Sequence, residues 1–89
     1  MIKAAIIKVY GRVQGVGFRF YTNKKAIELN ISGYVQNKPD GSVYIEAEGD
    51  ETDLITFIEW VNIGTQWARV SKVETQLMPP LNIVGFQMK

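Results

Sequence analysis

The order in which strand and helix patterns follow one another limits the possible folds of this chain more than any other feature. Runs rich in Ile, Val and Thr, bounded by glycine, proline or acidic residues, predict strands. These strands are predicted at residues 3–10, 32–36, 42–48, 69–77 and 83–88. Apolar side chains at three- and four-residue spacing predict one helix at 18–29 and a second that begins after Asp53 and ends at Gly64.

Each predicted helix has one apolar face that can pack on a sheet. In the first helix this face comprises Phe18, Thr22, Ala26 and Leu29, with Tyr21 beside it. In the second helix it comprises Leu54, Phe57, Ile58 and Val61. Asn30 follows the first helix and is expected to adopt a left-handed conformation that ends it.

The segment 32–48 has the pattern of a β-hairpin. Residues 37–41 include Pro39-Asp40-Gly41, which is typical of a tight turn. The order strand-helix-strand-strand-helix-strand, with a terminal strand added, is that of a ferredoxin-like α+β sandwich. We expect two helices on one face of a mainly antiparallel sheet of four to five strands, in a single domain of residues 1–89. This fold serves many functions, so the function has to be argued from a site.

Composition excludes several chemistries. The 89 residues include no histidine and no cysteine, which rules out His-dependent triads, thiolate nucleophiles and the usual zinc sites. No apolar run approaches the ~18 residues that a membrane span requires, and Lys3 interrupts the apolar N-terminal stretch. We therefore expect a cytoplasmic protein with no metal or other cofactor.

The charges are unevenly distributed along the chain. Residues 1–38 carry a net charge of +6, and residues 39–89 carry −5. An anion site would be favoured in the first part, although two solvated surfaces would produce the same imbalance.

The glycine-rich segment Gly11–Gly17 is the first candidate site. It joins a predicted strand to a predicted helix, where backbone N–H groups can approach an anion closely. The segment lacks the Gly-Lys-Ser/Thr ending of a Walker A loop and the third glycine of a dinucleotide fingerprint. Arg19, in the first turn of the helix, opposes the helix dipole unless an anion binds there. Taken alone, the glycines are equally consistent with a connecting loop that binds nothing, and Arg19 with an ordinary arginine on the protein surface.

Asn37, just before the turn, is the second candidate. Its amide can donate and accept hydrogen bonds together, which suits the orientation of an attacking water, but also a turn that bonds its own backbone. We interpret Asp40 as turn chemistry, and the acidic group at 50–53 as helix capping and solvated charge. Trp60 and Trp67 are expected to serve packing rather than base stacking.

Two longer segments resemble the signatures of a known family. Val9-Tyr10-Gly11-Arg12-Val13-Gln14-Gly15-Val16-Gly17-Phe18-Arg19 is similar to the first acylphosphatase signature. The stretch from Gly33 to Val43, followed by Glu46-Ala47-Glu48-Gly49, is similar to the second. The resemblance runs over the whole chain, up to the final Gly85-Phe86. One departure is Gly64-Thr65-Gln66-Trp67, where the family often has Gly-Pro.

The resemblance implies an acylphosphatase, a hydrolase that splits the carboxyl-phosphate bond of small acyl phosphates without a metal. It implies that Arg19 binds the phosphate and that Asn37 positions the nucleophilic water. The phosphate or another anion would lie in a loop whose backbone amides belong to Gln14, Gly15, Val16, Gly17, Phe18 and Arg19. We expect a monomer with no nucleic-acid or membrane partner.

Two other classes of function remain open at this point. Acylphosphatase-like domains also resemble parts of larger carbamoyl-phosphate-handling proteins of hydrogenase maturation, where such a domain could bind an anion without hydrolysis; the short chain favours a free-standing enzyme. RNA binding is common for this fold, but the aromatic RNP pattern is missing from the strand 42–48, whose Glu46 and Glu48 would repel a phosphate backbone.

Overall fold

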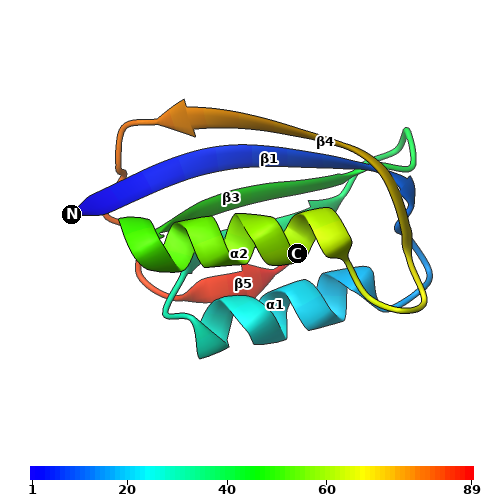
Figure 1. The fold of residues 1–89 in the computed structure, drawn as a ribbon, viewed down its shortest axis with the longest axis horizontal. Coiled ribbons are helices and arrows are strands. Elements are labelled where there is room, and N and C mark those ends of the chain that lie inside the picture. Colours follow the sequence, from blue (N-terminus) through cyan, green and yellow to red (C-terminus); the bar gives the residue numbers. More distant parts are fainter.

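A computed structural model describes residues 1–89 as a five-stranded sheet and two helices (Figure 1). The elements are β1 (Ile2–Arg12), α1 (Phe18–Glu28), β2 (Ser32–Asn37), β3 (Val43–Asp50), α2 (Glu51–Ile63), β4 (Arg69–Met78) and β5 (Phe86–Met88). The strand order is β4-β1-β3-β2-β5, antiparallel except for the parallel pair β2 and β5. The predicted ferredoxin-like α+β fold is confirmed.

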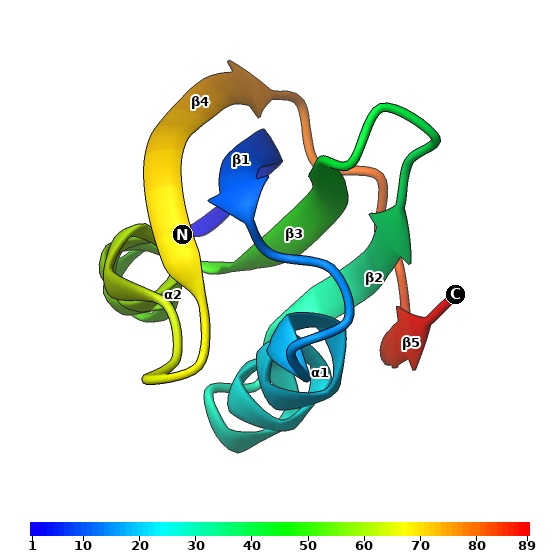
Figure 2. The same cartoon turned by 90° about the vertical axis from the view of Figure 1, so that its right-hand side faces the viewer.

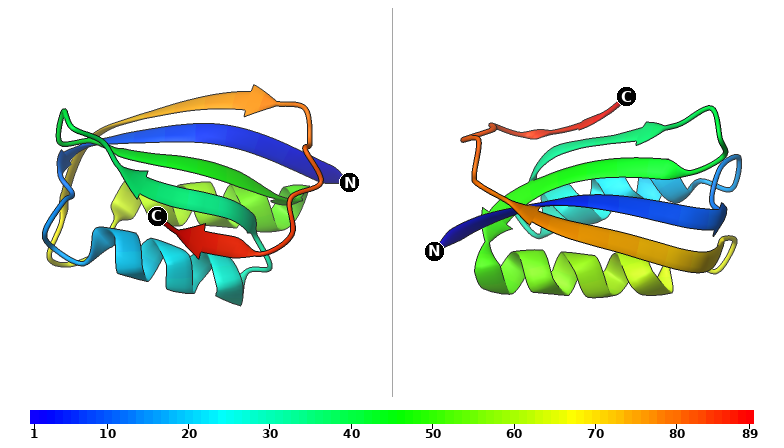
Figure 3. Two further views of the ribbon diagram at one scale, coloured as in Figure 1. Left: turned by 180° about the vertical axis from the view of Figure 1, so that it is seen from behind. Right: turned by 90° about the horizontal axis from the view of Figure 1, so that it is seen from above.

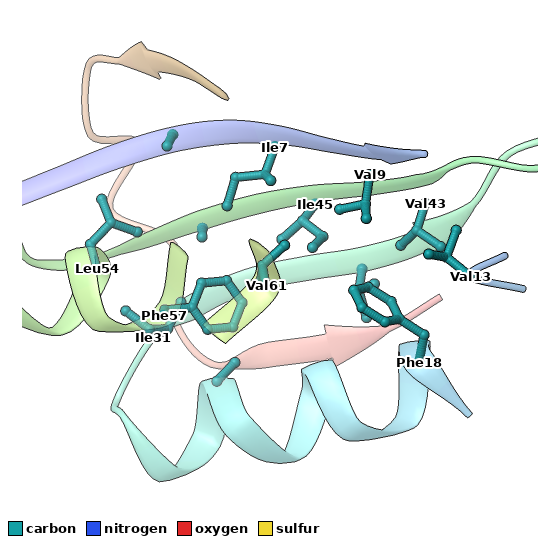
Figure 4. Close-up of a cluster of buried hydrophobic side chains, with 14 residues drawn as sticks. Ile7, Val9, Val13, Phe18, Ile31, Val43, Ile45, Leu54, Phe57 and Val61 are labelled. Atoms are coloured by element: carbon teal, nitrogen blue, oxygen red, sulfur yellow. The ribbon is translucent and has the colours of Figure 1, made fainter. Parts of the chain in front are cut away.

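Both helices cover the same face of the sheet, and the opposite face carries no helix (Figure 3). A cluster of 14 buried hydrophobic residues fills the space between the layers. Figure 4 shows Ile7 and Val9 of β1 and Ile45 of β3 above Phe57 and Val61 of α2. Neither helix is long and apolar enough to cross a membrane.

The centre of each predicted helix face is buried, while Leu29 and Ile58 are only partly buried, Tyr21 is exposed, and α2 begins at Glu51 rather than after Asp53. Phe18, Thr22 and Ala26 are the buried residues of α1, and Leu54, Phe57 and Val61 are those of α2. Asn30 has a φ of 57°, in the left-handed region expected after the helix. The acidic stretch behaves as expected at Asp50, whose carboxylate accepts a hydrogen bond from the Thr52 N–H at the start of α2.

The first strand is longer than predicted, and the loop after it is correspondingly shorter. β1 continues through Gly11 and Arg12, which pair with Val70 and Arg69 of β4 after a register shift between Tyr10 and Gly11. Gly11, which suggested the start of a loop, lies instead within β1 at this register shift, where an irregularity in the pairing with β4 is tolerated. The connection to α1 therefore begins at Val13.

The final strand is shorter than the predicted 83–88, because a buried carboxylate takes up the backbone groups that would have extended it. Glu48 is 5% exposed and accepts hydrogen bonds from the N–H groups of Leu81 (2.6 Å) and Ile83 (3.2 Å). The register with β2 begins at Phe86, next to a hydrogen bond from the Gly33 N–H to the oxygen of Gly85, which has a φ of 78°. Glu48 thereby fixes the path that brings β5 to the edge of the sheet.

Glu48→Ala is expected to lower the free energy of unfolding by about 1.5–3 kcal/mol, because two N–H groups lose a charged acceptor. Urea denaturation measures the change. The control is Glu59→Ala, an exposed residue of α2, which should stay within about 0.5 kcal/mol of the parent protein. Equal effects of the two substitutions would contradict the role assigned to Glu48.

Candidate active site

The connection between β1 and α1 is held at both ends by buried side chains. Val13 and Phe18 are each 1% exposed and lie together at one end of the core (Figure 4). Between them, Gly15 and Gly17 have φ values of 73° and 78°, in the left-handed region that favours glycine. The loop is thus short and anchored, and its backbone turns sharply at the end of the sandwich that faces the viewer in Figure 2.

The N-terminus of α1 carries no compensating negative charge. Gly17 is the N-cap and offers no side-chain acceptor, and no acidic residue lies in the first turn. The Tyr21 N–H, bonded to the Gly17 carbonyl at 3.0 Å, begins the helical hydrogen bonds. The N–H groups before it lie at the positive end of the helix dipole, a position that favours an anion.

A cavity of about 220 Å³ adjoins this loop and joins the two candidate segments. It is lined by Val13, Gly15, Gly17, Phe18, Arg19, Phe20, Asn37 and Met88. Arg19 and Asn37, which are far apart in sequence, therefore face one space. Arg19 is the only titratable side chain of the lining, so the cavity carries positive charge.

Arg19 is the second residue of α1 and is partly buried. Its Nη1 donates a hydrogen bond of 2.6 Å to the backbone oxygen of Lys89, the residue after β5. A guanidinium has five N–H donors in a planar fork, so this one bond orients the group and leaves other donors for a ligand.

Asn37 ends β2, where it pairs with Val43 of β3. Its side-chain oxygen Oδ1 is buried, and no group of the protein donates a hydrogen bond to it. A buried acceptor without a donor is costly in a folded protein, which marks this amide as available for a ligand in the cavity that it lines.

Gln14 has a role that the sequence did not reveal. Its Nε2 donates to the backbone oxygens of Lys38 and Ser42, both at 2.8 Å. These oxygens flank the β2–β3 turn, so one side chain joins the glycine loop to the segment that carries Asn37. Neither Gln14 nor Val16 is among the cavity-lining residues, and Val16 packs against the core instead. The role of Gln14 depends on a contact between segments that are distant in sequence, so no local sequence pattern could have indicated it.

The β2–β3 turn is also braced internally. The Asp40 carboxylate accepts hydrogen bonds from the Ser42 hydroxyl (2.6 Å) and the Ser42 N–H (2.9 Å). These two bonds hold the pKa of Asp40 below its ordinary value of 3.8. The interpretation of Asp40 as a turn residue agrees with this geometry.

Because the pKa of Asp40 is lower in the folded than in the unfolded chain, its carboxylate stabilises the turn above pH 3.8. This contribution is lost as the pH falls through the lowered pKa. An NMR titration of the Asp40 side-chain carbon should give a midpoint below 3.8, and Ser42→Ala should move it back toward that value. An unchanged midpoint in Ser42→Ala would contradict the assigned cause.

Gln14→Leu is expected to lower the free energy of unfolding by about 1–2 kcal/mol, since two hydrogen bonds are lost while the volume is kept. The turn should also open more often, so that the Lys38 N–H, which donates to Ser42 O, exchanges faster with solvent. Hydrogen exchange followed by NMR measures this rate. Unaltered exchange at Lys38 would show that the loop and the turn are not coupled through Gln14.

A comparison with known families identifies the family of this chain. The acylphosphatase family model covers residues 5–88 of this chain. The chain belongs to the acylphosphatase family, whose members are hydrolases.

Individual proteins that are similar to this chain include members of the same family. The chain is 50% identical over 74 residues to an acylphosphatase of Mannheimia succiniciproducens, covering 83% of this chain and 81% of the relative. The crystal structure of an acylphosphatase from Bacillus subtilis superimposes with a TM-score of 0.92 at 36% identity, over 100% of this chain and 99% of that one. Full-length HypF matches with a TM-score of 0.93 at 29% identity, but the chain covers only 12% of it.

Proposed function

We propose that this member of the acylphosphatase family hydrolyses the carboxyl-phosphate bond of small acyl phosphates, releasing a carboxylate and inorganic phosphate. Arg19 and the loop amides bind the phosphoryl group, and Asn37 orients the attacking water. The observation that supports these roles most strongly is that Arg19 and Asn37, an asparagine whose buried amide oxygen has no partner, line one cavity beside a helix N-terminus.

The phosphoryl oxygens are bound by the backbone N–H groups of residues 14–19 and by the free N–H groups of Arg19. The guanidinium carries a positive charge and the N–H groups carry partial positive charges, so they stabilise the negative charge on the equatorial oxygens of the transition state. The loop and the first helical turn are fixed by Val13 and Phe18, so this binding requires little rearrangement.

The water attacks phosphorus in line with the acyl oxygen. A hydrogen bond from the water to Asn37 Oδ1 directs a lone pair at phosphorus, the new P–O bond forms, and the bond from phosphorus to the acyl oxygen breaks. The electron pair leaves on the carboxylate, which is a weak base and needs no proton. The proton of the water passes to a phosphoryl oxygen, since the cavity is lined by no carboxylate or imidazole.

We also propose that turnover requires no divalent cation and that the enzyme acts in the cytoplasm as a monomer, without nucleic acid. The cavity lining lacks carboxylates that would bind a cation, and all the proposed site residues belong to one chain. Glu46 on the uncovered face of the sheet disfavours a nucleic-acid backbone there, in keeping with the missing RNP pattern.

Hydrolysis of acetyl phosphate in the presence of EDTA tests this proposal. Arg19→Ala should lower kcat/KM by about 10²- to 10³-fold, because a preorganised charge is removed from the transition state. Lys24→Ala, which removes an exposed cation from the same helix, is the matched control and should retain full activity. No turnover by the parent protein, or full activity of Arg19→Ala, would contradict the proposal.

Asn37→Ala separates orientation of the water from binding of the phosphate. Its kcat should fall by about 10²-fold, since the nucleophile loses its fixed position. Its inhibition constant for inorganic phosphate should stay near that of the parent protein, because Arg19 and the loop remain. Asn62→Ala on α2 is the control for asparagine removal. A collapse of phosphate affinity in Asn37→Ala would refute this division of roles.

A further inference from the structure

A second cavity lies on the face of the sheet that no helix covers, and the proposed mechanism does not use it. Its volume is about 510 Å³, and its lining includes Lys8, Tyr10, Lys38, Asp40, Ser42 and Tyr44. None of these residues lines the cavity that Arg19 and Asn37 share. The volume is within the range of about 300–1,000 Å³ that is usual for small-molecule sites.

Two strands and one turn form this cavity. Lys8 and Tyr10 of β1 alternate with residues of the core and therefore point to the face without helices (Figure 3). Tyr44 of β3 is the partner of Lys8 in the antiparallel register. The β2–β3 connection, which supplies the other lining residues, projects from the sheet on the side away from both helices (Figure 2).

Two ammonium groups of the lining have no carboxylate partner. The three ion pairs of the chain include neither Lys8 nor Lys38. Lys38 Nζ donates a hydrogen bond of 3.3 Å to the side-chain oxygen of Gln36, which is uncharged. The carboxylate of Asp40, by contrast, is bound by the hydroxyl and the N–H of Ser42. The lining therefore has an excess of positive charge, with two cations available to an anion.

Two tyrosine rings of the lining are held in place by their hydroxyl groups. Tyr10 donates to Glu74 at 3.0 Å, and Tyr44 donates to Glu46 at 2.9 Å. The ring of Tyr44 packs on that of Tyr34, with centroids 6.0 Å apart, and not on Tyr10. Both lining rings thus keep apolar surface for a ligand, and their fixed orientation lowers the entropy lost on binding. The two carboxylates beside them disfavour a long polyanion on this face.

We propose that this cavity binds a small phosphate ester with a planar ring, the class to which nucleoside monophosphates belong. Lys8 and Lys38 bind the phosphate as two point charges, and the planar ring lies against Tyr10 and Tyr44. Inorganic phosphate leaves the tyrosine rings without a contact, and an uncharged ring leaves the ammonium groups without an anion. The joined ligand should therefore bind more tightly than either part.

A ligand in this cavity contacts the turn that follows Asn37. The backbone oxygens of Lys38 and Ser42 accept the hydrogen bonds of Gln14, and the Lys38 N–H donates to Ser42 O at 2.9 Å. The same two residues line the cavity on the uncovered face. A ligand that binds the closed turn stabilises it, so the Lys38 N–H should exchange more slowly with solvent when the cavity is filled.

An NMR titration with adenosine monophosphate tests the site. Amide signals of Lys8, Lys38 and Tyr44 should shift together, and exchange at Lys38 should slow. Lys8→Gln combined with Lys38→Gln should raise Kd by about 3- to 20-fold, the loss expected for two exposed ion pairs. The control, Lys24→Gln combined with Lys25→Gln, removes the same charge from α1 and should leave Kd unchanged. Absent shifts, or equal Kd values for the two double variants, would overturn the site.

The separate parts of the ligand and a variant of the other cavity complete the test. Inorganic phosphate and adenosine should each shift the signals of Lys8 and Tyr44 only at higher concentrations than adenosine monophosphate. Arg19→Ala should leave these shifts unchanged, because Arg19 does not line this cavity. Binding here is therefore measured independently of whether the protein hydrolyses acyl phosphates. Equal affinity for inorganic phosphate and adenosine monophosphate, or loss of the shifts in Arg19→Ala, would contradict the proposal.

Discussion

The proposed site depends on the hydrogen bonds of one side-chain amide. Gln14 leaves the glycine loop and donates to two backbone oxygens of the β2–β3 segment, at Lys38 and Ser42. The glycine loop leads into the positive end of α1, which carries Arg19, and the β2–β3 segment carries Asn37. Both side chains line one cavity. The link through Gln14 adds to the sheet and to the packing of Val13 and Phe18 in the core, which hold the same two halves of the site. The arrangement explains how a chain without histidine or cysteine presents a charged group and an orienting group to one cavity.

The other end of the molecule supports the same site through a buried carboxylate. Glu48 binds the backbone after β4 and so directs β5 to the free edge of β2. Met88 of β5 then lines the cavity that Arg19 and Asn37 share, and the backbone oxygen of Lys89 accepts a hydrogen bond from Arg19. The contact between Glu48 and the β4–β5 connection thus supports, through β5, the residue that binds the guanidinium. Contacts between segments that are distant in sequence build the site. Neither Gln14 nor Glu48 lines the cavity, and both support residues that do.

Patterns with a strict local period could be predicted from the sequence, and the features set by distant contacts could not. The faces of both helices, the hairpin and the left-handed Asn30 follow from residue spacing and turn chemistry, and the structure confirms them. The predicted ends of β1 and β5 were wrong. Pairing with β4 extends β1, and the hydrogen bonds to the Glu48 carboxylate shorten β5. The choice of Arg19 and Asn37 came from motif resemblance, while the hydrogen bonds of Gln14 had no sequence signal. The roles of the site residues stay predictions.

In the proposed mechanism, a water held at Asn37 attacks phosphorus rather than the acyl carbon. Hydrolysis of acetyl phosphate in ¹⁸O-labelled water, followed by ³¹P NMR and mass spectrometry of the acetate, tests it most directly. We expect one labelled oxygen in each inorganic phosphate released and none in the acetate. Label in the acetate would show attack at the carbonyl carbon and would contradict the mechanism proposed for the cavity.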